Sequence, residues 1–128
     1  MTNRDNEIIK LRPEIDFGDI PQPLEQFQEV LRQVLKFQHD VLVQTTRDYL
    51  EHKYKGFSTR DETVKEELFY QSLKKDIPFK KDLIGMIKGM FTSLELEYYL
   101  NNQQEINKRL VEFIYKRVLS ELSLQYTT

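Results

Sequence analysis

The two histidines, His39 and His52, are the side chains of this sequence best suited to bind a metal or to transfer protons near neutral pH. Both fall within one predicted helix, and about 20 Å of helix axis separates them. They therefore cannot share a metal ion within one chain. Asp48 precedes His52 by one helical turn, so we expect these two side chains to pair on the helix surface.

Carboxylates offer another route to a metal site. Acidic residues gather near the start of the second predicted helix, at Asp61, Glu62, Glu66 and Glu67. Acidic residues are also favoured in the first turn of any helix because they complement the positive end of its dipole. No second carboxylate pair stands at a spacing typical of calcium or magnesium binding. We therefore expect no metal site and no cofactor.

Nucleophilic catalysis has no recognisable signature in the chain. Cysteine is absent, no serine lies in a Gly-x-Ser-x-Gly or Ser-x-x-Lys setting, and no glycine-rich loop could cradle a phosphate. Acid–base catalysis needs only two suitably placed side chains, so an enzyme or a small-ligand binder with a pocket between helices stays open as an alternative. We expect a protein without enzymatic activity.

Nucleic-acid binding is the strongest rival function. Residues 92–117 have the pattern of a short helix, a tight polar turn and a longer helix, which is typical of a helix-turn-helix. The predicted turn is short and lacks glycine, and Glu97, Glu105 and Glu112 would face or border the phosphates. The front of the longer helix carries side chains able to contact base edges, namely Gln103, Gln104, Asn107, Lys108 and Arg109.

A second basic cluster surrounds the junction between the second and third predicted helices. It consists of Lys74, Lys75, Lys80 and Lys81, which could contact a nucleic-acid backbone. The net charge of −2 argues against nucleic acid as the main partner. We expect these lysines to be solvated.

The composition is that of one soluble globular domain. The 128 residues are 39% hydrophobic and 31% charged, and no apolar run is long enough to span a bilayer. The polar amino terminus lacks the basic-then-apolar pattern of a secretory signal, and the absence of cysteine fits a reducing compartment. We expect a cytoplasmic protein.

The stretch from Pro23 to Tyr54 predicts one long amphipathic helix, because apolar residues recur at steps of three and four without an internal glycine or proline. Polar residues dilute its apolar face between Gln38 and Thr46. This polar middle is either a solvated shoulder or a site that sets register against a partner. We place candidate protein contacts at Gln38 and Thr45.

Turn and capping signals divide the rest of the chain. Gly56 is expected to end the first helix in a left-handed conformation, and Asp76 is expected to cap the third. Thr59 with Glu62, and Thr92 with Glu95, have the spacing of capping boxes. A short helix should follow Thr92, and a long last helix should begin near Gln104.

Gly85 and Gly89 lie one turn apart in the third predicted helix. Because glycine costs about 1 kcal/mol relative to alanine inside a helix, we expect another helix, the first, to approach the backbone closely there. The expected core comprises Leu31, Val34, Leu35, Leu83, Ile87, Met90, Leu110, Phe113 and Ile114.

Residues 1–22 are predicted to be an extended arm, because Pro13, Gly18 and Pro21 prevent a regular helix through its second half. Three of its apolar residues need a surface to cover them. The arm either packs across its own bundle or docks in a groove of a partner chain. We regard Ile15, Phe17 and Ile20 as candidate protein contacts.

The predicted fold is all-α. Residues 23–128 form an irregular antiparallel bundle of four main helices and one short helix, preceded by the arm. We expect a small interaction or regulatory module that presents a helical face or the arm to a protein partner, either another protein or a second copy of the chain.

Overall fold

The computed structural model describes residues 3–12 and 22–125, with side chains described as far as Leu122. The described residues are almost entirely helical and contain no strand, so the all-α prediction is confirmed. The elements are α1 (Asn3–Leu11), α2 (Pro23–Phe37), α3 (His39–Lys53), the short 3-10 helix η1 (Phe57–Thr59), α4 (Glu62–Lys75), α5 (Ile77–Lys88), α6 (Ser93–Asn101) and α7 (Gln103–Gln125).

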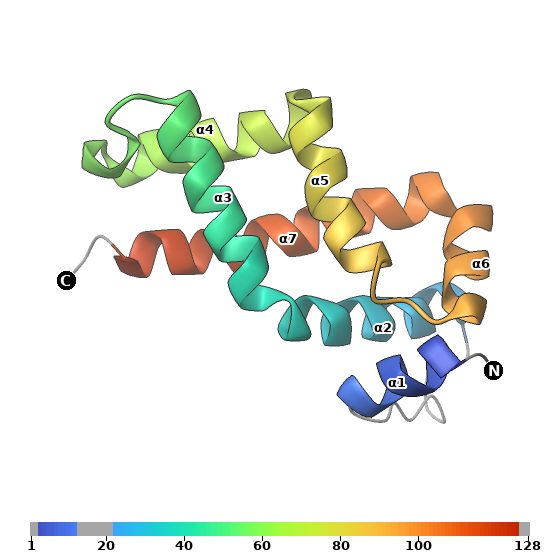
Figure 1. Cartoon of the computed structure of the whole chain (residues 1–128). Coiled ribbons are helices and arrows are strands. Elements are labelled where there is room, and N and C mark those ends of the chain that lie inside the picture. The colour runs from blue at the N-terminus through green and yellow to red at the C-terminus, as the bar shows by residue number, and fades with distance from the viewer. Residues whose placement is uncertain (1–2, 13–21, 126–128) are drawn as a thin grey trace.

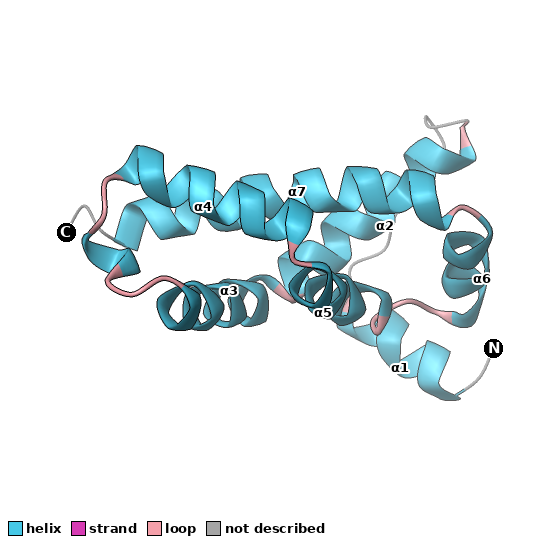
Figure 2. Cartoon of the chain, turned by 90° about the horizontal axis from the view of Figure 1, so that it is seen from above, coloured by secondary structure: helices cyan, strands magenta, loops and turns pink. Residues whose placement is uncertain are grey.

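Helix α7 is the long axis of the molecule. It contacts α2, α3, α4, α5 and α6. Helices α2 and α4 run roughly alongside α7, while α3 and α5 cross on one side of these three (Figures 1 and 2). This crossing layer brings α3 and α5 opposite each other on one face of the molecule.

The core lies where the crossing layer meets α7. Of the nine residues predicted to be buried, seven are buried, while Met90 and Phe113 are half-buried against the same core. Aromatic residues that the prediction left out fill much of the remaining space, because they are among the largest fully buried side chains: Phe57, Phe69, Phe91 and Tyr99.

The long first helix is divided, which corrects the prediction of one helix from Pro23 to Tyr54. Helix α2 ends at Phe37 and α3 begins at His39, and the chain bends sharply between them (Figure 1). The Gln38 side chain donates a hydrogen bond from Nε2 to the backbone oxygen of Met86 in α5, at 3.0 Å. This bond joins the bend between α2 and α3 to α5.

The amino-terminal region is helical where it is described, which corrects the prediction of an extended arm for Asn3–Leu11. Helix α1 packs in the same chain against the connection between α5 and α6. Arg4 donates hydrogen bonds to the backbone oxygens of Gly89 and Phe91, at 2.7 and 2.8 Å. The other arm candidates, Ile15, Phe17 and Ile20, lie outside the described residues.

Two further side chains fasten α1. Asp5 is 2% exposed and accepts hydrogen bonds from the Ser93 backbone N–H at 2.8 Å and from its hydroxyl at 3.2 Å. Arg12 forms an ion pair with Glu95 at 2.6 Å and donates to the backbone oxygen of Met90 at 3.1 Å. The described part of the arm therefore packs across its own domain.

Most predicted caps are present. Gly56 has the predicted left-handed conformation, with a φ of 70°, but it lies two residues beyond Tyr54, the C-terminal cap of α3, and precedes η1. Asp76 accepts a hydrogen bond from the Phe79 backbone N–H, and Thr92 with Glu95 forms a capping box. The predicted box between Thr59 and Glu62 is wrong, because Thr59 lies in η1 and α4 begins after Asp61.

The predicted close helix packing at Gly85 and Gly89 is also wrong. A Cβ atom added at Gly85 would meet nothing within 4 Å. At Gly89 the nearest neighbour would be the Gly85 oxygen of the same helix, at 3.2 Å. Gly89 is the C-terminal cap of α5, so this glycine ends the helix and does not admit a neighbouring one.

None of the described helices combines the length and apolar character needed to cross a membrane.

Candidate functional site

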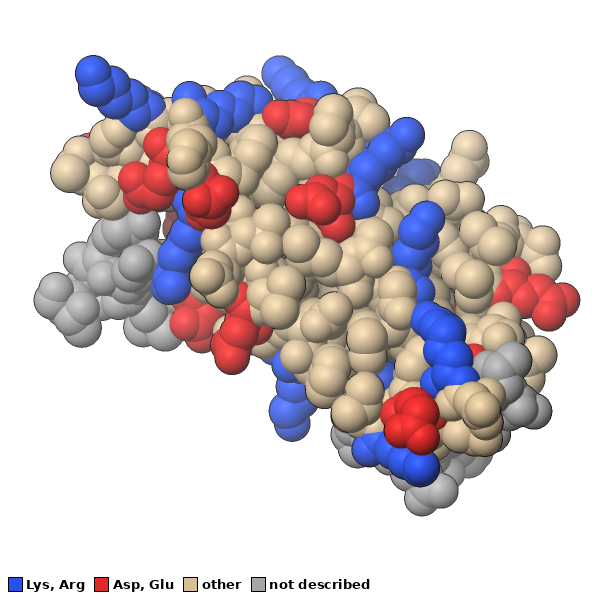
Figure 3. All heavy atoms as spheres, viewed as in Figure 1, with Lys and Arg blue, Asp and Glu red and all other residues tan. Residues whose placement is uncertain are grey.

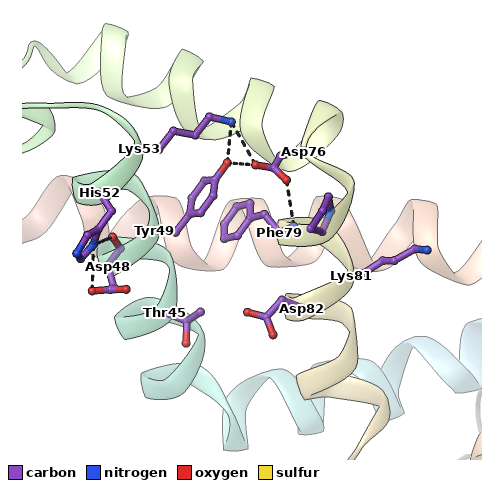
Figure 4. A pocket seen from close by; sticks show the side chains of 10 residues that line it. Thr45, Asp48, Tyr49, His52, Lys53, Asp76, Phe79, Lys81 and Asp82 are labelled. Carbon is purple, nitrogen blue, oxygen red and sulfur yellow. Dashed lines mark hydrogen bonds and ion pairs between the residues drawn. The ribbon is translucent and has the colours of Figure 1, made fainter.

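A cleft of about 910 Å³ lies between α3 and the start of α5, and we call it the α3/α5 cleft (Figure 4). Its side chains come from the second half of α3 and from the first turns of α5, together with the Asp76 cap. Both helices are held firmly beside it, because α3 packs on α7 and α5 packs on α4 and α7.

Two stacked aromatic rings close the inner side of the α3/α5 cleft. The ring centroids of Tyr49 and Phe79 are 3.8 Å apart, and their planes differ by 4°. Phe79 is buried, whereas Tyr49 is half-buried and reaches the cleft. The stack joins α3 to α5 and prevents the cleft from extending into the core.

A hydrogen-bonded cluster of three ionisable groups lies at one end of the cleft. The Tyr49 hydroxyl donates to Asp76 Oδ2. Lys53 donates from Nζ to the Tyr49 hydroxyl at 2.9 Å and to Asp76 Oδ2 at 3.2 Å. Asp76 Oδ1 accepts the Phe79 backbone N–H at 3.2 Å, so the same carboxylate caps α5 and holds α3.

The cluster fixes the charge of each member. Burial, followed by the hydrogen bond to Asp76, raises the pKa of the Tyr49 phenol. The hydrogen bond from Tyr49, followed by that from the Phe79 N–H, lowers the pKa of Asp76. The bond to Tyr49 raises the pKa of Lys53. At neutral pH the cluster therefore consists of a neutral phenol, a carboxylate and an ammonium group.

The walls of the cleft carry further charges. On α3, His52 Nδ1 lies 3.3 Å from Asp48 Oδ1, as the spacing of these residues predicted. On α5, the Asp82 carboxylate points across the opening toward Thr45, whereas Lys81 extends away from α3 (Figure 4). Asp82 is exposed and makes no hydrogen bond or ion pair within the part of the chain that the structure describes.

The surrounding surface is mixed. On the face formed by α3 and α5, acidic and basic side chains are interspersed with uncharged surface (Figure 3).

The second histidine lies elsewhere. His39 Nε2 is 3.4 Å from Glu121 Oε1, and its Nδ1 is 3.3 Å from Nη1 of Arg117, both on α7. Among residues 3–12 and 22–122, no three metal-ligating side chains lie close enough together to hold an ion.

The two helical protein-contact candidates behave differently. Gln38 is half-buried and bonded to α5, so its amide already has a partner inside the fold. Thr45 is half-buried and lines the α3/α5 cleft. Of these two candidates, only Thr45 lies at the α3/α5 cleft.

The residues proposed for base contacts are not arranged as in a helix-turn-helix. Asn102 alone separates α6 from α7, whereas that motif uses a turn of about three or four residues. Arg109 pairs with Glu105 at 3.2 Å, and Asn107 accepts a hydrogen bond from the Tyr99 hydroxyl at 2.7 Å. The remaining three are exposed: Gln103, Gln104 and Lys108.

Sequence reasoning missed most of the cleft. The spacing of Tyr49 and Lys53 by one helical turn was a usable signal for their contact, and Asp76 was recognised only as a cap. The stacking of Tyr49 on Phe79 joins helices that are separated by the whole of α4, and no local pattern indicates it.

No protein-family model, curated protein or solved structure matches this chain. Its function is therefore inferred from its own side chains.

Proposed function

We propose that the protein is an interaction module whose α3/α5 cleft receives a basic segment of a protein partner. The observation that carries this proposal is the Asp82 carboxylate, which points across an open cleft and has no partner in the described chain. A carboxylate in this position attracts a lysine or arginine side chain of a bound segment.

The balance of charge in the cleft supports a cationic ligand. Lys53 and Asp76 neutralise each other within the cluster. Asp82 then remains on the α5 wall without a partner among the described residues, and Asp48 on the α3 wall lies 3.3 Å from His52. Lys81 also lines the cleft, but its side chain extends away from α3. The stacked rings of Tyr49 and Phe79 supply apolar surface for the aliphatic part of a basic side chain.

The fixed charges of the cluster favour binding over proton transfer. A general acid or base works best when its pKa lies near the operating pH. The pKa shifts of Tyr49, Lys53 and Asp76 all move away from neutrality. The cluster therefore positions α3 against α5 and shapes the cleft.

The proposal is tested by titrating the full chain with a short peptide of alternating Arg and Ser residues and with its Glu-for-Arg counterpart. Nuclear magnetic resonance follows the backbone amides of the protein. We expect the basic peptide alone to bind and to shift the amides of Thr45, Tyr49 and Asp82. Raising the salt concentration should weaken binding, because the rim charges are solvent-exposed.

Asp82→Asn should lower the affinity for the basic peptide by about two- to fivefold, which is the contribution of one exposed ion pair. Adding Asp48→Asn should lower this affinity further. Glu51→Gln is the matched control, because Glu51 is an exposed acid on α3 that does not line the cleft. Equal binding of the acidic peptide, or an equal effect of Glu51→Gln, would refute the proposal.

A further inference from the structure

A second hollow, of about 350 Å³, lies where α4, α5 and α7 pack together, and we call it the lysine groove. It is lined by Lys74 from α4, Lys80 from α5 and Lys108 from α7, with Gln104 and Asn107 beside them. The fold thus unites the two basic groups that stand apart in the sequence.

The lysine groove carries an excess of positive charge. Lys74 pairs with Glu112 at 3.1 Å, and this hydrogen bond raises the pKa of Lys74. Lys80 and Lys108 have no acidic partner anywhere in residues 3–12 or 22–122. Glu105, one turn before Arg109 on α7, is already engaged by that arginine. Two ammonium groups are therefore left for an anion.

The polar groups beside the lysines suit an oxyanion. Asn107 Oδ1 accepts the Tyr99 hydroxyl, which leaves the NH₂ group of the Asn107 amide as the end able to donate into the groove. Gln104 is exposed and offers a second amide. Ammonium and amide N–H groups that converge from three helices are the donors that phosphate oxygens accept.

An aromatic side chain stands next to the groove. Tyr70 lies one turn before Lys74 on α4, its ring centroid is 5.2 Å from Lys74 Nζ, and 42% of the residue is exposed. The edge-on contact with Tyr115, at a centroid distance of 5.2 Å, holds the Tyr70 ring in place. A fixed, exposed ring beside a cationic groove is the arrangement that binds single strands, because bases stack while phosphates pair with lysine.

We infer that the lysine groove binds the phosphate backbone of a single-stranded nucleic acid, with Tyr70 stacking against a neighbouring base. This site is separate from the α3/α5 cleft and uses no helix-turn-helix geometry. The net charge of −2 opposes the approach of a polyanion, so binding is weak and strongly dependent on salt.

The test measures fluorescence anisotropy of a labelled oligothymidine with the full chain at low salt and at increasing salt. Binding should fall with salt, with a logarithmic slope of about −0.7 for each phosphate contacted. Lys80→Gln combined with Lys108→Gln should reduce the slope by about 1.4 and lower affinity several-fold. Lys88→Gln is the matched control, since Lys88 is an exposed lysine of α5 that does not line the groove.

Tyr70→Leu should lower the affinity for the oligothymidine by about fivefold or more. The slope of affinity against salt should stay unchanged, because stacking does not release counterions. Circular dichroism of each variant confirms that the helices remain. Unlabelled adenosine monophosphate and inorganic phosphate, added as competitors, distinguish a strand from a free phosphate source.

Absence of binding at low salt would overturn the inference, as would equal losses in the double variant and in Lys88→Gln. If adenosine monophosphate competes at the same concentration as the oligonucleotide, the ligand of the groove is a free nucleotide and not a strand, and the inference is wrong. Tighter binding of a duplex of the same length would refute the stacking role of Tyr70.

Discussion

The two ends of α5 are held in opposite ways. At its start, Asp76 caps the Phe79 N–H only three residues along the chain, and solvent reaches the carboxylate. At its end, the backbone oxygens of Met86, Gly89 and Met90 accept hydrogen bonds from side chains of distant elements, which are Gln38, Arg4 and Arg12 respectively. Asp76 also binds Tyr49 and Lys53 of α3, so the first end combines a local helix cap with solvent-open contacts to α3. The second end is held by long-range contacts that α1 partly covers.

This difference determines how much each end contributes to stability. The Arg12 and Glu95 side chains are 6% and 17% exposed, so solvent screens their attraction little. Asp76 and Lys53 are more open to water, and exposed ion pairs contribute little. We expect substitutions at the end of α5 to reduce stability more than those at its start.

Arg12→Ala should have the largest effect. It removes the buried ion pair to Glu95 and leaves the Met90 carbonyl without its donor, which we expect to lower the free energy of unfolding by about 3 kcal/mol. Denaturant unfolding measures the loss. Lys10→Ala is the control, because it removes the exposed pair with Glu7 and should cost less than about 0.5 kcal/mol. Similar values for the two variants would show that α1 is not fastened by Arg12.

Gln38→Leu should rank second. The substitution leaves the Met86 carbonyl in α5 without the Gln38 amide, so we expect a loss of about 1–2 kcal/mol. Gln44→Leu, at an exposed position of α3, provides the comparison in the same unfolding experiment. A gain in stability for Gln38→Leu would mean that the bend between α2 and α3 does not depend on this bond.

Tyr49→Phe should cost less than about 1 kcal/mol, because the ring still stacks on Phe79 and only the hydroxyl is lost. The raised pKa of Tyr49 favours the neutral phenol in the folded state, so its contribution is present below pH 10 and is lost as the pH rises through the folded pKa. When the phenols are titrated and followed by ultraviolet absorbance, the variant should show one fewer tyrosine that ionises at high pH than the unchanged protein. An unchanged titration would place Tyr49 outside the cluster.

Asp76→Asn should have the smallest effect near neutrality, because asparagine also caps helices. The lowered pKa of Asp76 means that the carboxylate stabilises the fold above its ordinary pKa of 3.8, and this contribution disappears as the pH falls through the folded pKa. Thermal unfolding at a series of pH values should therefore show the wild type and variant converging below pH 3.8. A constant difference down to the lowest pH would contradict the low pKa.

The same contrast explains what could be predicted from sequence. Asp76 and Thr92 act on backbone groups within a few residues, so their capping roles follow from local spacing. Arg4 and Gln38 act on backbone groups far along the chain, and their sequence positions carry no sign of those partners.

The two hollows show the same limit. In the sequence, the lysines of α4 and α5 and the polar and basic residues of α7 form two separate groups, and only the packing of three helices joins them in the lysine groove. The polarity of Thr45 within an apolar stripe indicates a candidate contact, whereas the side chains opposite it on α5 come from beyond an entire intervening helix. Periodicity indicates which face of a helix is buried, whereas it does not specify the helix that covers this face.

The pairing of α1 with the α5–α6 connection also sets an order of events during synthesis. Arg12 and Glu95 are separated by 83 positions, so the ribosome releases α1 long before its partner exists. At about 5–20 residues per second, this interval lasts roughly 4–17 s. The docking of α1 therefore cannot precede the synthesis of α6, which carries Glu95.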